Sequence, residues 1–111
     1  TYSLVSMGAA LFVIVSEMVS ANYLGVYNID PLRMASQIIM GVGFLGAGLI
    51  IFKDHQLMGL TTAGGLWVAA GIGTAVGFGF YTLAIAATAL TLFVFTALWY
   101  IEFLIKKITN K

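Results

Sequence analysis

One uncharged, glycine-rich stretch limits what this chain can fold into more than any other feature. Residues 38–52 read Ile-Ile-Met-Gly-Val-Gly-Phe-Leu-Gly-Ala-Gly-Leu-Ile-Ile-Phe, so four glycines lie among large apolar residues. Gly41, Gly43 and Gly46 match the G-x-G-x-x-G fingerprint of dinucleotide-binding folds. That fingerprint requires a strand before it and an acidic residue about 20 positions after it. The other interpretation is a membrane helix whose glycines allow close packing, and the two imply different classes of protein.

The composition and the neighbouring sequence favour the membrane helix. The chain is 61% hydrophobic and 8% charged, whereas soluble proteins are roughly 45–50% apolar and about 25% charged. So few charges could not cover the surface of a soluble fold. No alternating strand precedes Gly41, and the nearby acidic residue Asp54 follows too closely. The net charge of +1 argues against binding to nucleic acid, which requires a basic surface, and the absence of cysteine excludes disulfides and thiolate chemistry.

The hydrophobic pattern predicts an all-α fold, a polytopic transmembrane helix bundle in a single domain over residues 1–111. Segments of about 20 apolar residues can cross a hydrocarbon core of about 30 Å. We predict four such spans, at residues 4–24, 31–52, 59–77 and 80–105. Asp30 and Pro31 are typical of a helix start, Gly25 and Asn28 belong to the first loop, and the polar run 53–56 is predicted to be a loop. Because the sequence does not begin with Met, we expect it to be a fragment of a longer protein.

The basic residues predict the orientation in the membrane. With four spans, the 53–58 loop and the C-terminus lie on one side, which carries Lys53, Lys106, Lys107 and Lys111, and the other side carries only Arg33. Basic residues accumulate in cytoplasmic loops. We therefore expect the 53–58 loop and the C-terminus to be cytoplasmic.

Small residues are expected to hold the helices together, because close backbone contact drives helix association in lipid. In the third span small residues recur every four positions from Gly65 to Gly77, and in the second span Gly43 and Ala47 make a similar pair. We expect the second and third spans to form a close-packed pair. The predicted packing residues are Gly41, Gly43, Gly46, Gly48, Gly65, Gly73 and Gly77.

A few polar residues inside or beside the spans are candidate functional residues, because ionisable groups in a membrane are costly. We expect Glu17 either to extend to the membrane–water interface or to form a hydrogen bond with a neighbouring helix. The alternative is a role in handling an ion or a proton. Arg33 and Gln37 lie one turn apart and can share a face. Arg33 pairs with Asp30 or a lipid headgroup, or contacts a solute or partner.

Further candidates lie in and near the third span. Thr61 and Thr62 are expected to bond back to their own helix or to cap it, and in a transporter Thr61 would line a water-accessible path. Trp67 is expected to face lipid or to pack. His55 has no second ligand at metal spacing. Hydrolase, zinc-protease and P-loop motifs are missing from the sequence, so we predict neither an enzyme nor a cofactor.

Two long blocks resemble the MgtC/SapB family of bacterial inner-membrane proteins. Residues 33–48 contain Arg-Met-Ala-Ser-Gln followed by Gly-Val-Gly-Phe-Leu-Gly-Ala-Gly, similar to the family's R-x-A-x-Q…G-I-G-F-L-G-A-G block. Residues 59–67 resemble its G-L-T-T-A-x-x-L-W block, and the small residues of 70–77 resemble the run that follows. The start, from Thr1 to Phe12, also fits. The family usually has an earlier membrane segment with a G-x-x-x-G-x-E-R-E motif, which this sequence lacks, and Glu17 is not part of the family motif.

The resemblance implies an inner-membrane protein linked to adaptation to low magnesium and, in pathogens, to survival inside host cells. It implies action through other membrane proteins at least as much as transport. We therefore expect a non-enzymatic membrane regulator that contacts the lipid bilayer and another membrane protein or a second copy of itself. The alternatives are a transporter of an ion or small solute, with Glu17, Arg33, Gln37 and Thr61 along its path, and an oligomeric scaffold without a solute.

Overall fold

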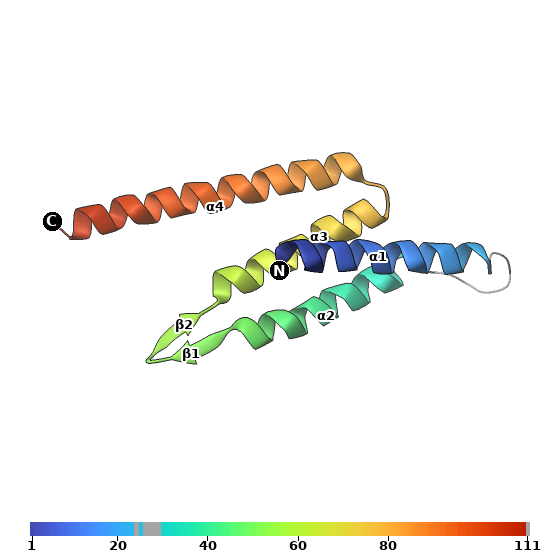
Figure 1. The fold of residues 1–111 in the computed structure, drawn as a ribbon, viewed down its shortest axis with the longest axis horizontal. Helices are drawn as coiled ribbons and strands as arrows, with labels where there is room; N and C mark the ends of the chain where they lie inside the picture. Colours follow the sequence, from blue (N-terminus) through green and yellow to red (C-terminus); the bar gives the residue numbers. More distant parts are fainter. Residues whose placement is uncertain (24, 26–29, 111) are drawn as a thin grey trace.

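Four helices follow one another along the chain, with a small β-hairpin between the second and the third (Figure 1). The computed structural model describes residues 1–23, 25 and 30–110. The helices are α1 (Tyr2–Ala21), α2 (Arg33–Leu49), α3 (Leu60–Gly77) and α4 (Tyr81–Thr109), and the strands are β1 (Ile51–Lys53) and β2 (Gln56–Met58). By length and composition α1, α3 and α4 can each cross a membrane, and α2 is a shorter apolar helix of 17 residues. The predicted helical membrane fold is confirmed.

Helix α2 is shorter than its predicted span at both ends. Pro31 and Leu32 form a turn before the helix, so α2 begins at Arg33. Asp30 sets up this start, because its Oδ1 accepts a hydrogen bond from the Leu32 N–H at 3.0 Å. The helix ends at Leu49 instead of residue 52, since the backbone of Ile50 is extended, with φ −80° and ψ 115°.

The other three helices differ from their predicted spans at the ends. Helix α1 begins and ends earlier than the predicted span 4–24, and α4 runs four residues past the predicted end at 105. Helix α3 matches the predicted span 59–77 to within one residue. Three residues used in the predictions lie outside the described residues. They are Leu24 at the end of the first predicted span, Asn28 in the first predicted loop and Lys111 in the predicted orientation.

The polar run predicted as a loop is the tip of the hairpin. The antiparallel pairs are Ile51 with Met58, Phe52 with Leu57 and Lys53 with Gln56. Asp54 and His55 have φ values of 54° and 63°, and a two-residue type I′ turn needs positive φ at both of these positions. The apolar run continues from α2 into β1 without a break, which is why the hydrophobic pattern placed these residues in a helix.

Helix α3 is the centre of the bundle, and each of the other helices packs on it (Figure 1). Leu66 of α3 is 2% exposed and Val13 of α1 is fully buried. The buried apolar cluster also draws on α2, and its members are Ala9, Val13, Ile38, Val42, Leu66 and Ala70. The described residues include no buried polar or charged side chain. The remaining apolar surface is exposed, as expected for helices in lipid.

Candidate functional site

The closest helix contact in the bundle is made by the glycines of α3 against α1. Gly65 lies against the ring of Tyr2, Gly73 lies under the backbone carbonyl of Ser6, and Gly77 lies beside Val13. A Cβ atom at Gly77 would come within 2.7 Å of the Val13 Cβ, closer than non-bonded carbon atoms pack. Because these contacts follow the same order along both helices, α1 and α3 run parallel.

The glycines of α2 are arranged differently from the expected close pair with α3. Gly46 is in ordinary contact with α3, because a Cβ atom added to Gly46 would lie 3.6 Å from the Ala63 Cβ. Added Cβ atoms at Gly41, Gly43 and Gly48 would meet no atom within 4 Å in the described chain. The close pair is therefore α1 with α3, and most of the small surface of α2 is open.

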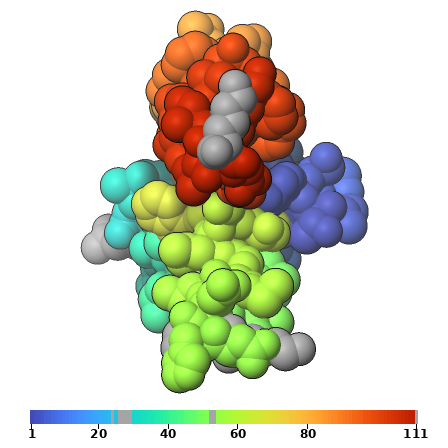
Figure 2. Space-filling model, turned by 90° about the vertical axis from the view of Figure 1, so that its left-hand side faces the viewer, coloured from blue at the N-terminus to red at the C-terminus, as the bar shows by residue number. Residues whose placement is uncertain are grey.

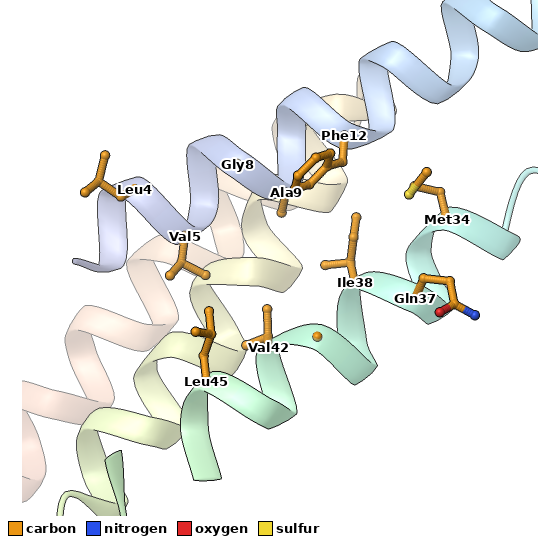
Figure 3. Close-up of a pocket in the computed structure, with 11 residues that line it drawn as sticks. Leu4, Val5, Gly8, Ala9, Phe12, Met34, Gln37, Ile38, Val42 and Leu45 are labelled. Atoms are coloured by element: carbon orange, nitrogen blue, oxygen red, sulfur yellow. The ribbon is translucent and has the colours of Figure 1, made fainter. Parts of the chain in front are cut away.

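A groove of about 650 Å³ lies between α1 and α2, which touch each other at few positions although both pack on α3. Figure 3 shows Val5 of α1 pointing toward α2, and Ile38 and Val42 of α2 pointing toward α1. Gln37 is the polar side chain among the lining residues. The groove is lined by Leu4, Val5, Gly8, Ala9 and Phe12 of α1 and by Met34, Gln37, Ile38, Gly41, Val42 and Leu45 of α2.

Trp67 borders two smaller grooves on the other side of α3. One, of about 370 Å³, lies between α2, α3 and α4, and the other, of about 450 Å³, lies between α3 and α4 and includes Thr61. The Trp67 side chain is 58% exposed. It therefore reaches the lipid-facing surface and borders packed helices at the same time.

The candidate polar residues on α1 and α2 gather at one end of the bundle. Glu17 is exposed one turn before the end of α1, and Arg33 and Gln37 are exposed in the first two turns of α2. The Arg33 N–H donates a hydrogen bond to the Asp30 carbonyl at 3.2 Å. In the described part of the chain, no ion pair joins the side chains of Asp30 and Arg33. The ion pair found there is between Glu102 and Lys106 on α4.

Thr61 and Thr62 lie at the opposite end, exposed in the first turn of α3. The N-terminus of α3 has no side-chain cap, and the threonines that bond back to a carbonyl four residues earlier are others, such as Thr74 and Thr88. The candidates therefore do not converge on one site. The described residues also contain no group of three or more His, Asp or Glu side chains placed to hold a metal ion.

The groove is the feature that the sequence analysis missed. The large apolar side chains of its α2 wall are Met34, Ile38, Val42 and Leu45, spaced by four, four and three residues, which is the spacing of one helix face. That stripe was readable in the sequence, but which helix would face it was not. Chemically the groove offers apolar side chains, three small residues and one amide, which suits an apolar helix or a lipid chain.

Known proteins resemble nearly the whole chain. The model of the MgtC family matches residues 1–103. The chain is 45% identical over 96 residues to the Escherichia coli K12 protein named "Putative magnesium transporter YhiD", with 85% of this chain and 45% of that protein covered. Protein SapB of Bacillus subtilis is 38% identical over 111 residues, with 97% and 47% covered. Protein MgtC of Salmonella typhimurium LT2 is 42% identical over 92 residues, with 83% and 37% covered.

These relatives are longer proteins, and the chain spans less than half the length of each. No solved structure matches the chain significantly. The names of the relatives concern magnesium or the family itself and none names an enzyme. The family model covers almost all of the sequence, including both blocks that carried the resemblance. The chain therefore belongs to the MgtC family.

Proposed function

We propose that this chain is the transmembrane part of a non-enzymatic regulator in the bacterial inner membrane that acts by binding another membrane protein. The family to which it belongs implies a role in adaptation to low magnesium and, in pathogens, in survival inside host cells. The hairpin and the C-terminus face the cytoplasm, because the basic residues of the sequence collect on that side. The activity and partners of the whole protein are part of the same proposal.

The open groove between α1 and α2 is the observation that carries this proposal. Helices in lipid associate through small residues that let backbones approach, and through occasional polar side chains. The groove offers both, with Gly8, Ala9 and Gly41 as small residues and Gln37 as a hydrogen-bonding group. It faces outward, so an apolar helix of a partner can enter from the bilayer.

Photocrosslinking in cells grown at low magnesium tests this proposal. Phe12 lines the groove, whereas Phe93 is exposed on α4 and lines none of the three grooves. Each is replaced, in the full-length protein, by a photoreactive phenylalanine analogue. We expect one defined protein adduct from position 12 and none from position 93. Equal yields at both positions, or adducts only with a second copy of the chain, would contradict the regulator and favour the scaffold.

Transport of magnesium or another solute is the second candidate function, and the name of the YhiD relative supports it. Glu17, Arg33 and Gln37 lie at one end of the bundle and Thr61 at the other, so a path would have to join both ends. Purified full-length protein in liposomes with an enclosed magnesium-sensitive dye tests this. Flux that Arg33→Ala abolishes, with Lys107→Ala on the exposed end of α4 as control, would favour transport over regulation.

A further inference from the structure

Helix α2 ends, and the β1–β2 hairpin begins, before the helix is long enough to cross the hydrocarbon core of a membrane. The 17 residues of α2 rise about 25 Å, compared with a hydrocarbon core of about 30 Å. The apolar sequence continues through Ile50 and Ile51, but their backbone is extended and not helical. These two extended residues add about 7 Å, so α2 together with the start of the hairpin matches the thickness of the hydrocarbon core.

The hairpin base is apolar on both faces and exposed. Ile51 pairs with Met58, and the next pair brings Leu57 to the opposite face. The side chains of Ile51, Met58 and Leu57 are 55%, 55% and 60% exposed. A hairpin in water would bury one apolar face and show a polar one. Figure 2, which looks onto this end of the molecule, shows the hairpin projecting at the lower edge, away from α4.

The backbone of the hairpin cannot lie in the hydrocarbon core of the membrane. Each strand of a two-stranded sheet has one edge whose N–H and C=O groups are unpaired. Unsatisfied backbone groups exposed to lipid tails are too costly to occur. Water alone would leave the three apolar side chains without a partner. The boundary between headgroups and acyl chains satisfies both requirements, since it offers hydrogen-bonding groups to the edges and apolar chains to the side chains.

We propose that the hairpin is a lipid-binding element that docks on the phospholipid interface of the bilayer the protein spans. Ile51, Leu57 and Met58 enter the headgroup–acyl boundary, and the turn at Asp54 and His55 stands in water. The next large apolar side chain along the sequence, Leu60 at the start of α3, is also exposed, at 58%. The docked hairpin thereby fixes the depth at which α2 ends and α3 begins.

Site-directed spin labelling tests this proposal cleanly, because the sequence contains no cysteine. Single cysteines are placed at Leu57, Met58 and Asp54 in the full-length protein, reconstituted in liposomes of phosphatidylethanolamine and phosphatidylglycerol. Leu92, exposed on α4 within the span, is the hydrocarbon control. All four positions are exposed, so the labels replace side chains outside the packed core. Circular dichroism verifies that each variant keeps its helices.

The readout is the collision rate of each label with oxygen, which concentrates in lipid, and with an aqueous nickel complex. We expect labels at Leu57 and Met58 to have a several-fold higher ratio of oxygen to nickel collisions than the label at Asp54, below the ratio at Leu92. Nickel collisions at Leu57 as frequent as at Asp54 would place the hairpin in water and overturn the proposal. Exclusion of both reagents from Leu57 and Met58 would also overturn it, because protein would then cover the hairpin.

Discussion

Gly73 lies directly under the backbone of α1, where an added Cβ would collide with the Ser6 carbonyl. Gly73→Ala should therefore lower the free energy of unfolding by about 1–3 kcal/mol, the usual cost of overpacking. Gly71→Ala is the matched control, because no atom lies within 4 Å of its added Cβ. Unfolding in mixed detergent micelles measures both variants. Equal stability of the two would show that α1 and α3 are not in close contact.

Gly59 is required for a different reason, since it joins the hairpin to α3 with a φ of 82°. Its added Cβ would also collide with the Leu49 carbonyl. Gly79→Ala has the same backbone cost, about 1–2 kcal/mol, at a φ of 86° but without a collision. We expect Gly59→Ala to be clearly less stable than Gly79→Ala in the same unfolding experiment. The reverse order would mean that the turn before α3 is shaped differently.

At the scale of single helices, the central position of α3 predicts where truncation is costly. Leu66 is 2% exposed, whereas Leu92 of α4 is 61% exposed. Leu66→Ala should cost about 2–5 kcal/mol of stability, as for a buried leucine that leaves a cavity. Leu92→Ala should cost far less, because lipid tails can fill the space. Denaturant titration followed by circular dichroism compares the two, and similar losses would contradict a bundle centred on α3.

The elements show which parts of the fold the sequence could predict. Long apolar runs locate membrane helices directly, because about 20 residues must match the bilayer, and each of the four helices begins and ends within four residues of its predicted span. The hairpin was not predicted, because Asp54-His55 lacks the Asn-Gly or Asp-Gly signal of a tight turn. The small residues of α3 were recognised, but a small-residue stripe does not specify its neighbour. The groove escaped notice for the same reason.

At the scale of the whole molecule, successive helices run in opposite directions (Figure 1). The hairpin and the C-terminal end of α4 lie toward the same end of the structure, opposite the end of α1 (Figure 1). Under the proposed orientation, reporter fusions after Met58 and after Asn110 should both show cytoplasmic activity, and a fusion after Tyr23 should show periplasmic activity. Opposite results for Met58 and Asn110 would require an odd number of crossings between them.

The role of the α1–α2 groove is tested most directly by filling it. Gly41 lines the groove and has no atom within 4 Å of an added Cβ, and Gly48 is equally open but lines none of the three grooves. Growth at low magnesium is measured in cells whose own gene is replaced by full-length Gly41→Leu or Gly48→Leu, after both proteins are verified in the membrane. We predict that Gly41→Leu abolishes growth support while Gly48→Leu retains it. Wild-type growth with Gly41→Leu would contradict a regulator that binds its partner in this groove.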